Sequence, residues 1–404
     1  MSWNEITIAE IGNIITGKTP PTSVKENYGG TMPFITPSDM KGYRTIDDTE
    51  RHISEKGKLS VGKCVLPPNS ICVSCIGSDM GKVVITSKES ISNQQINSII
   101  CNSKYDYQFV YYLMLMLRDP IRSLGKNATA VPILNKSKFS NIRIRVPPLL
   151  IQRRIASILS AYDDLIENNQ KQIKLLEEAA QRLYKEWFVD LRFPGSESVK
   201  VVDGVPEGWR KSLIVDLCEK INAGGTPSRR NENYWNGATI KWYKTQELQD
   251  CWLIDSDEKI TEEGLRNSSA KFFPENTILM AIYASPTLGR LGILDSDATC
   301  NQAALCLKAN EDLISWQWLY GKLYELRDYY NGIARGAGQQ NISGEVVKQT
   351  VVLCPVKEVI DKFTKIVAPM FEKQRKLQKQ NLDLAEARDR LLPKLMSGEL
   401  EAGE

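Results

Sequence analysis

The chain has little of what usually marks an enzyme centre or a membrane segment. Among its 404 residues there is one histidine, His52, which disfavours Ser-His-Asp, Cys-His and zinc chemistry. The longest strongly apolar run, near residues 111–117, is far shorter than the roughly 20 residues that a membrane helix needs. The first residues, MSWNEI, lack the charged and apolar regions of a signal peptide. We therefore expect a cytoplasmic protein with no membrane partner.

Metal-binding and catalytic motifs are also missing. The nine cysteines are scattered, and Cys72 and Cys75 have no second pair at zinc-like spacing. We interpret these two as reduced thiols on a buried strand. The sequence has no Asn-Pro-Pro-Tyr or Asp-Pro-Pro-Tyr methylation motif, and Asp39 and Lys41 lack the paired acid of a nuclease metal site. We predict no catalytic residue, no metal site and no cofactor bound by this chain.

Charge is nearly balanced overall but uneven along the chain. The formal net charge is +3. Residues 1–148 carry 18 basic and 12 acidic side chains, a balance of +6, whereas residues 206–354 carry 16 basic and 19 acidic, a balance of −3. Bulk charge therefore gives no nucleic-acid signal, and any DNA binding must depend on local patches.

Residues 12–19, GNIITGKT, match the phosphate-binding pattern G-x-x-x-x-G-K-[ST]. That loop needs a helix that begins at the Gly-Lys-Thr, but Pro20 and Pro21 come next. Each lacks an N–H and disfavours the helical conformation in the residue before it. We interpret the segment as a turn. A hidden nucleotide-dependent enzyme, which Lys18→Ala would inactivate, is an alternative.

The sequence repeats itself once, with an offset of 206 to 208 residues. Ordered matches include Gly17-Lys18-Thr19-Pro20 with Gly224-Gly225-Thr226-Pro227, Asn27 with Asn233, Asn93-Gln94 with Asn301-Gln302, and Pro147 with Pro355. The second copy of the first motif has no lysine, so the copies share a Gly-x-Thr-Pro backbone turn.

Each repeat has two parts. About 150 residues rich in glycine, proline and short β-rich runs predict an α+β lobe, and a long heptad pattern with a period of about 3.5 residues predicts a helix packed along another helix. The expected segments are a first lobe (1–148), a first long helix (149–190), a linker (191–205), a second lobe (206–354), a second long helix (355–398) and a tail (399–404). The predicted core of the helix pair is Ile155, Leu159, Tyr162, Ile166, Asn169, Ile173, Leu176, Leu183, Phe363, Ile366, Met370, Leu377, Leu384 and Leu391.

The simplest partner of the first long helix is the second, packed as an antiparallel coiled coil with the lobes related by a pseudo-two-fold axis. A homodimeric coiled coil is the alternative. We interpret the polar Asn169 as a register device, with contact to a partner protein as the alternative. Pro369 should kink or divide the second helix. Two unlike lobes on a rigid helical spacer suit DNA read as two unlike half-sites.

Motifs at the joints between lobes and helices form an ordered set. They are VPPLLIQRRIA (146–156), QRLYKEWFVDLRFPG (181–195), VPEGW (205–209) and RLLPKLMSGEL (390–400), with both Gly-x-Thr-Pro turns. With them the whole chain resembles the specificity (S) subunit of type I restriction–modification enzymes. The resemblance implies that each lobe is a target recognition domain that reads one half of a bipartite, asymmetric site in double-stranded DNA. It also implies that the chain is non-catalytic.

The resemblance further implies partners. The helices would set the gap between half-sites and dock two methyltransferase (modification) subunits, which bring S-adenosylmethionine and methylate adenine at N6. Motor-nuclease (restriction) subunits would add translocation and cleavage dependent on ATP and Mg. The alternatives are a stand-alone bipartite-site DNA-binding protein, such as a repressor or architectural factor, and a protein scaffold that binds no DNA.

The candidates for DNA contact are polar and basic residues beside turns, because Arg bridges guanine and Asn or Gln bridges adenine in the major groove. In the first lobe they are Lys18, Thr19, Ser38, Lys41, Ser78, Lys126, Asn127, Lys136 and Lys138. In the second lobe they are Thr226, Ser228, Arg229, Arg230, Lys244, Gln246, Arg290, Arg335, Gln339, Gln340 and Asn341. Glycines in 332–341 would let the backbone approach phosphate closely.

Arg229→Ala or Arg335→Ala is expected to weaken recognition of one half-site and to leave assembly through the helices intact, because both residues belong to a lobe. Methylation of target DNA measures the first effect, and co-purification with methyltransferase subunits measures the second. Loss of those subunits from either variant would contradict this division of labour.

Overall fold

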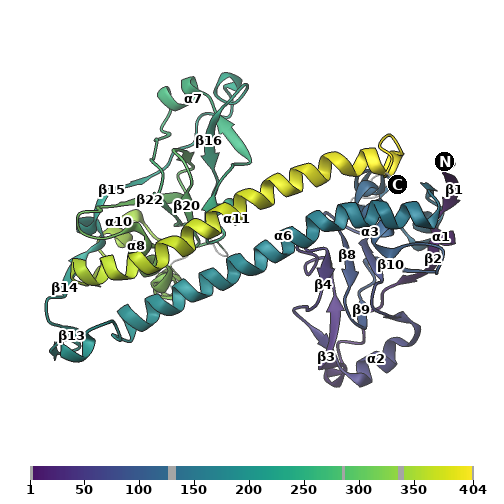
Figure 1. Cartoon of the computed structure of the whole chain (residues 1–404), viewed down its shortest axis with the longest axis horizontal. Helices are drawn as coiled ribbons and strands as arrows, with labels where there is room; N and C mark the ends of the chain where they lie inside the picture. Colours follow the sequence, from purple (N-terminus) through teal and green to yellow (C-terminus); the bar gives the residue numbers. More distant parts are fainter. Residues whose placement is uncertain (1–2, 126–132, 284–286, 335–340, 403–404) are drawn as a thin grey trace. The chain divides into compact units, whose positions relative to one another are not determined.

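The computed structural model describes residues 3–125, 133–283, 287–334 and 341–402. The chain forms two compact units, one of Met1–Asn168 with Asn381–Glu404 and the other of Asn169–Gln380. Each unit contains one lobe and part of each of two long helices, α6 (Leu149–Tyr184) and α11 (Lys357–Ser397), as Figure 1 shows.

The lobe of the first unit is built around a five-stranded sheet. Its strands are β1 (Asn4–Thr7), β2 (Gly12–Thr16), β3 (Tyr28–Ile35), β4 (Thr45–Ile46), β5 (His52–Ile53), β6 (Val65–Leu66), β7 (Ile71–Ser74), β8 (Val83–Thr86), β9 (Ser90–Ser92), β10 (Ile96–Cys101) and β11 (Arg143–Val146). Its helices are α1 (Ile8–Ile11), α2 (Glu55–Val61), α3 (Tyr107–Met116), α4 (Arg118–Gly125) and α5 (Lys136–Ser140). The main sheet has the order β2-β10-β7-β8-β4, a second sheet has the order β5-β3-β9-β6, and β1 pairs with β11.

The lobe of the second unit repeats this topology. Its strands are β12 (Val201–Val202), β13 (Val205–Pro206), β14 (Arg210–Leu213), β15 (Cys218–Ala223), β16 (Ile240–Tyr243), β17 (Cys251–Leu253), β18 (Glu258–Ile260), β19 (Ile278–Ala281), β20 (Leu291–Leu294), β21 (Thr299–Cys300), β22 (Ala304–Ala309) and β23 (Val351–Cys354). Its helices are α7 (Glu262–Arg266), α8 (Trp316–Glu325), α9 (Arg327–Ala334) and α10 (Gly344–Lys348). The sheets have the orders β15-β22-β19-β20-β17, β18-β16-β21 and β14-β23. This matching order confirms the internal repeat and the α+β class.

Local chemistry accounts for the main elements. Every residue of β7 and of β8 is buried, which fits their β-branched composition because both faces of these strands are covered. Short helices start at polar N-caps. The side chain of Asp106 accepts a hydrogen bond from the N–H of Phe109, and Ser315 does the same for Trp318 at the start of α8.

In the first unit the two long helices are joined through one buried carboxylate. Asp163 on α6 is 4% exposed. Its Oδ1 accepts from Nη1 of Arg388 on α11 at 2.5 Å, and its Oδ2 accepts from the hydroxyl of Tyr112 on α3. The contact fixes both helices against the lobe.

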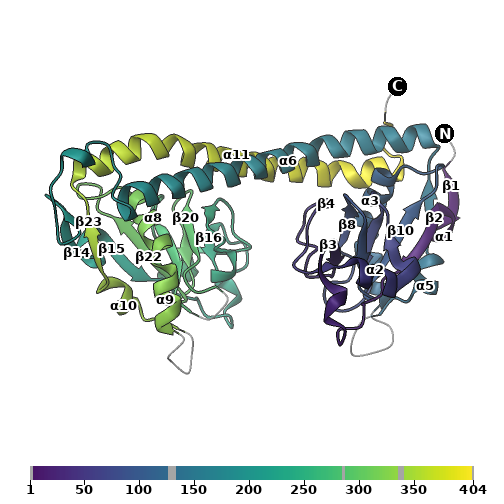
Figure 2. The same ribbon diagram turned by 90° about the horizontal axis from the view of Figure 1, so that it is seen from below.

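In the second unit the helices run antiparallel and pair within the chain, and both views of the ribbon draw α6 beside α11 (Figure 2). Asn169 is buried, and its Nδ2 donates to Oε1 of Gln380 at 3.1 Å. Further along α6, the ring of Tyr184 packs against Phe363, with centroids 6.0 Å apart. The Asn169–Gln380 bond is the contact expected of a register device.

Burial separates the predicted core residues into groups. Buried are Ile155, Leu159, Asn169, Phe363 and Leu377, and half-buried are Tyr162, Ile166, Ile173, Leu176, Leu183, Met370, Leu384 and Leu391. Ile366 is 43% exposed, so its assignment to the core is wrong. The buried residues of this part of α11 are Phe363, Val367 and Phe371, spaced by four, because they face the hydrophobic cluster of the second lobe. The helix also runs on through Pro369, which does not divide it.

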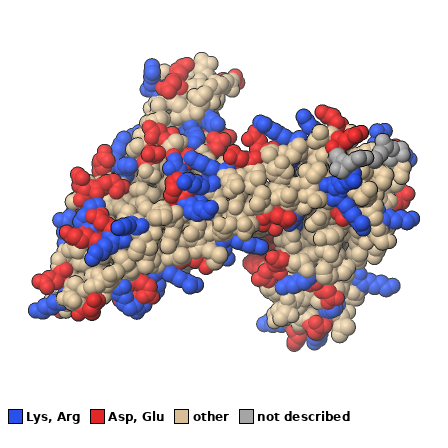
Figure 3. All heavy atoms as spheres, viewed as in Figure 1, with Lys and Arg blue, Asp and Glu red and all other residues tan. Residues whose placement is uncertain are grey.

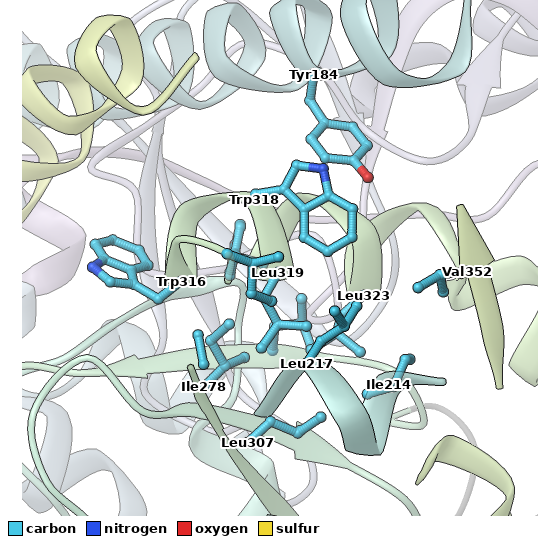
Figure 4. Close-up of a cluster of buried hydrophobic side chains, with 14 of the residues drawn as sticks. Tyr184, Ile214, Leu217, Ile278, Leu307, Trp316, Trp318, Leu319, Leu323 and Val352 are labelled. Atoms are coloured by element: carbon cyan, nitrogen blue, oxygen red, sulfur yellow. The ribbon is translucent and has the colours of Figure 1, made fainter. Parts of the chain in front are cut away.

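The core of the second lobe lies between α8, the sheet and α6. Figure 4 shows Tyr184 beside Trp318, with Leu323 turned toward Leu217. The approach of α8 to α6 is unusually close. A Cβ on Gly321 would lie 2.2 Å from the ring of Tyr184, so only glycine allows this packing.

A hollow of about 570 Å³ lies beside this core. Its walls include Glu177, Tyr184, Trp252, Tyr320 and Phe371. Burial, reinforced by the charge of Asp250, raises the pKa of Glu177 to about 7. Because the folded-state pKa lies above the ordinary value of 4.5, the ionised carboxylate destabilises the fold. The stability of this unit should therefore fall as pH rises from about 4.5 to about 7, and level off above that.

Asp163→Ala should lower the free energy of unfolding by about 3 kcal/mol, because it leaves Arg388 and Tyr112 without their shared partner. Chemical denaturation measures the loss. The matched control is Tyr112→Phe, which removes one hydrogen bond and should cost about 1 kcal/mol. Equal costs for the two variants would show that Asp163 does not couple the helices.

Glu177→Gln should stabilise the protein at pH 8, by about 1 kcal/mol once screening by solvent is allowed for. The gain should shrink as pH falls through 7 and vanish near pH 4.5, where the native glutamate is protonated in both states. Thermal unfolding across this range measures it. If the stabilisation by Glu177→Gln does not change with pH, it arises from packing rather than from removal of the charge.

Candidate nucleic-acid interface

In each lobe two parallel strands end side by side. In the first lobe Ile35 of β3 pairs with Ser92 of β9, and in the second Tyr243 of β16 pairs with Cys300 of β21. The carboxyl ends of parallel strands lie at one edge, so the residues that follow them meet there. We call this place the strand-end edge. It is formed by Thr36-Pro37-Ser38 and Asn93-Gln94-Gln95 in the first lobe, and by Lys244-Thr245-Gln246 and Asn301-Gln302 in the second.

The Gly-x-Thr-Pro turn packs on this edge in both lobes. The N–H of Lys18 donates to the carbonyl of Ser92 at 2.8 Å. A Cβ on Gly17 would lie 2.2 Å from the carbonyl oxygen of Asn93, and one on Gly224 would lie 2.5 Å from that of Asn301. Glycine is therefore required by close packing. No helix begins between Gly17 and Pro21, all of which the structure describes, so the phosphate-loop alternative is wrong.

At each strand-end edge a threonine side chain is hydrogen-bonded to a glutamine side chain. The hydroxyl of Thr19 donates to Oε1 of Gln94 at 2.7 Å, and that of Thr226 donates to Oε1 of Gln302 at 2.5 Å. Gln94 and Gln302 are both exposed. The two lobes thus present a tethered amide at the same place.

The first lobe is hollowed next to its edge. The hollow has a volume of about 360 Å³ and is lined by Thr36, Ser38, Arg51, Ser78, Asn93 and Gln95 among others. Arg51 lies over the ring of Phe34, 5.0 Å from its centroid. Within the described part of the chain Arg51 has no ion-pair partner. Its exposed guanidinium can therefore bind a phosphate or a base acceptor.

The second lobe holds its basic residues differently. The guanidinium of Arg229 lies 3.7 Å from the ring centroid of Trp235 and forms an ion pair with Glu258. Lys244 lies 3.0 Å from the same carboxylate. The hydrogen bond from Arg229 is the largest of the effects that lower the pKa of Glu258. One carboxylate thus partly neutralises two of the predicted DNA-binding cations.

Some of the residues predicted to contact DNA lie at the two strand-end edges, and others lie elsewhere. Lys18, Thr19, Ser38 and Ser78 lie at the first edge or hollow, and Thr226, Lys244 and Gln246 lie at the second. Elsewhere are Lys41 in an exposed loop, Lys136 and Lys138 on α5, Ser228 and Arg230 beside Arg229, Arg290 before β20, and Asn341 before α10. Outside the described residues are Lys126, Asn127, Arg335, Gln339 and Gln340.

Sequence reasoning missed residues that the fold brings to these edges. They are Arg51, Asn93, Gln94, Gln95, Asn301 and Gln302. The repeated Asn-Gln pair was the available signal, but it served only to align the two copies. The Asn-Gln pair lies beside the Gly-x-Thr-Pro turn because two parallel strands pair, and these strands are far apart in sequence.

Four general features describe the rest of the chain. Acidic and basic side chains are interspersed over the face drawn in Figure 3. In the part of the chain that the structure describes, no helix is long and apolar enough to cross a membrane. Nor do the described histidine, cysteine and acidic residues form a cluster able to hold a metal ion. Cys72 and Cys75 are free and buried, as predicted.

Comparison with known proteins gives one consistent family. Residues 1–178 and 206–386 each match the type I restriction modification DNA specificity domain. The MjaIX type I restriction enzyme specificity subunit of Methanocaldococcus jannaschii is 28% identical over 411 residues, covering 100% of this chain and 94% of the relative. The HindI specificity subunit of Haemophilus influenzae is 38% identical over 178 residues, which cover 42% of this chain and 38% of the relative.

A solved structure shows the same fold. The S subunit of a type I restriction-modification system from M. genitalium has a TM-score of 0.58 and 17% identity, and the likeness covers 98% of this chain and 96% of that one. Family matches in both repeats thus agree with the repeated lobes seen here. The chain therefore belongs to the type I restriction–modification DNA specificity family, as a non-catalytic DNA-recognition subunit.

Proposed function

We propose that this chain reads a bipartite, asymmetric DNA site in a cytoplasmic type I restriction–modification complex, one half-site with each lobe. The observation that carries the proposal is the strand-end edge, which has the same framework in both lobes but different side chains around it. Thr36 and Ser38 of the first lobe correspond to Lys244 and Gln246 of the second. Frameworks of one shape with unlike side chains suit two half-sites of unlike sequence.

The long helices support the second part of the proposal, which is that they dock two adenine-N6 methyltransferase subunits and set the gap between half-sites. Along the part of α6 that belongs to the first unit, the apolar residues Ile158 and Leu165 are 37% and 48% exposed. Their spacing of seven residues places them on one face of the helix. Such a stripe is what a partner helix would cover.

The chemistry then belongs to the partners. Methyltransferase subunits would supply S-adenosylmethionine and the motif that this sequence lacks. Motor-nuclease subunits would supply ATP- and Mg-dependent translocation and cleavage. The role of this chain is to position those subunits on a chosen sequence.

The test is a map of N6-methyladenine across the host genome, with and without this gene. Deletion should remove methylation from one split motif, two unlike half-sites with a fixed gap, and from no other. Restoring the gene should restore that motif. If the methylated motifs are unchanged on deletion while the purified chain assembles with its methyltransferase on DNA, the proposed role in choosing the site is wrong.

A further inference from the structure

The two strand-end edges share an asparagine, Asn93 or Asn301, and one hydrogen-bonded side-chain pair, while other side chains around them differ. Thr19–Gln94 and Thr226–Gln302 occupy matched positions with matched hydrogen bonds. Around them, Lys18 is replaced by Gly225 and Gln95 by Ala303 at the corresponding positions of the repeat. Side chains that differ between lobes suit bases that differ between half-sites. A side chain that both lobes keep suits something that both half-sites contain.

We propose that Gln94 and Gln302 contact the base pair common to both half-sites, the adenine·thymine pair whose adenine is methylated. The inference rests on the proposed function, because two adenine-N6 methyltransferase subunits acting on a site with two half-sites imply one target adenine in each half-site. The neighbouring, unmatched residues then read the bases that make the site asymmetric.

The chemistry of the pair fits this role. A glutamine amide can accept from N6 of adenine and donate to N7 at the same time. The threonine hydroxyl occupies one lone pair of Oε1 and leaves the second lone pair and both Nε2 hydrogens available. Because the hydroxyl limits rotation of a long, exposed side chain, less conformational entropy is lost when the amide binds DNA.

The turns beneath the glutamines also have unsatisfied polar atoms. Ser92 Oγ, at the end of β9 just before the first edge, and Asn301 Oδ1, in the second edge, are buried and have no hydrogen-bond partner among the described residues. Buried polar atoms are normally paired. Ser92 and Asn301 are not corresponding positions of the repeat, but each lobe thus has a buried polar atom beside its glutamine that a bound water can satisfy.

The contact belongs to recognition rather than to methyl transfer. A methyltransferase must take its target base out of the helix, so the amide can hold adenine only while the base is stacked and paired. Each glutamine would select where the methyltransferase acts and release the base when it is extruded.

The experiment uses the chain assembled with its methyltransferase subunits and duplexes that carry the mapped split motif. Replacing the target adenine of one half-site by 7-deazaadenine removes N7 and should weaken binding by the native complex about ten-fold. In a complex that carries Gln94→Leu, 7-deazaadenine should not weaken binding further when it lies in the half-site of the first lobe. In the other half-site it should weaken binding as much as it does for the native complex. Gln302→Leu should show the reverse pattern.

Matched variants distinguish loss of the contact with the base from loss of the folded structure. Gln94→Met keeps the length of the side chain without its amide and should behave like Gln94→Leu. Thr19→Ser keeps the hydroxyl and should behave like the native protein, whereas Thr19→Val should show part of the defect. Coupling between protein and base changes is calculated as a double-mutant cycle, which cancels general losses of affinity.

Two outcomes would overturn the inference. If the leucine variants bind all duplexes more weakly and keep the 7-deazaadenine effect in both half-sites, the pairs only tether a turn. If the native complex shows no effect of 7-deazaadenine while still preferring the split motif, the glutamines do not read that base. A native complex without any preference for the motif would instead contradict the proposed function itself.

Discussion

The structure depends on how each lobe is joined to the long helices, because this contact orients the edge that the lobe presents. In the first unit Arg44, beside β4, forms ion pairs with Asp164 and Glu167 of α6. In the second unit the signs are reversed. Asp295, at the end of β20, lies 2.5 Å from Arg375 and 2.8 Å from Lys379 of α11. Burial acts to raise the pKa of Asp295, yet these two cations hold it below its ordinary value. Glu167 and Arg375 are corresponding positions of the repeat, whereas Arg44 and Asp295 are not, so the two units use the same helix position for the contact but opposite charges and different lobe positions. Each lobe therefore fits its own helical segment and would meet a like charge on the other.

Much of this fold follows from local pattern. The heptads and the alternation of β-rich runs depend on residues close in sequence, and the repeat is found by comparing the chain with itself, so together they predicted two α+β lobes and two long helices. Errors arose where burial depends on distant partners. Ile366 fits the heptad but is exposed, since the second lobe rather than α6 determines which face of α11 is covered. Pro369 was expected to kink or divide its helix. It lies on an exposed face, where water can satisfy the carbonyl group that loses its N–H partner, so the helix continues.

The candidate site was harder to predict than the fold. Turn chemistry pointed to Thr19 and Thr226, but each hydroxyl is used within the protein to hold a glutamine. Gln94 and Gln302 themselves were seen only as alignment anchors. Their importance appears once β3 pairs with β9, and β16 with β21, since parallel pairing places turns distant in sequence at one edge. Such non-local pairing has no signature in a single sequence. The same limit applies to Arg229, whose stacking on Trp235 and pairing with Glu258 could not be read from its place beside a turn.

The electrostatics of the two edges give the lobes unequal roles on DNA, if the proposed function holds. Arg51 of the first lobe stands beside an open hollow with no ion-pair partner among the described residues. Arg229 and Lys244 of the second lobe already share a carboxylate. Before either cation can bind a phosphate fully, its contact with Glu258 must weaken, which offsets part of the gain from counterion release. The first lobe should then supply more of the salt-dependent affinity, and the second should depend more on shape and hydrogen bonding. The opposite charge balances of residues 1–148 and 206–354, +6 and −3, agree with this division. Under the proposed function, lobes that differ in how they bind as well as in which bases they read would match an asymmetric site.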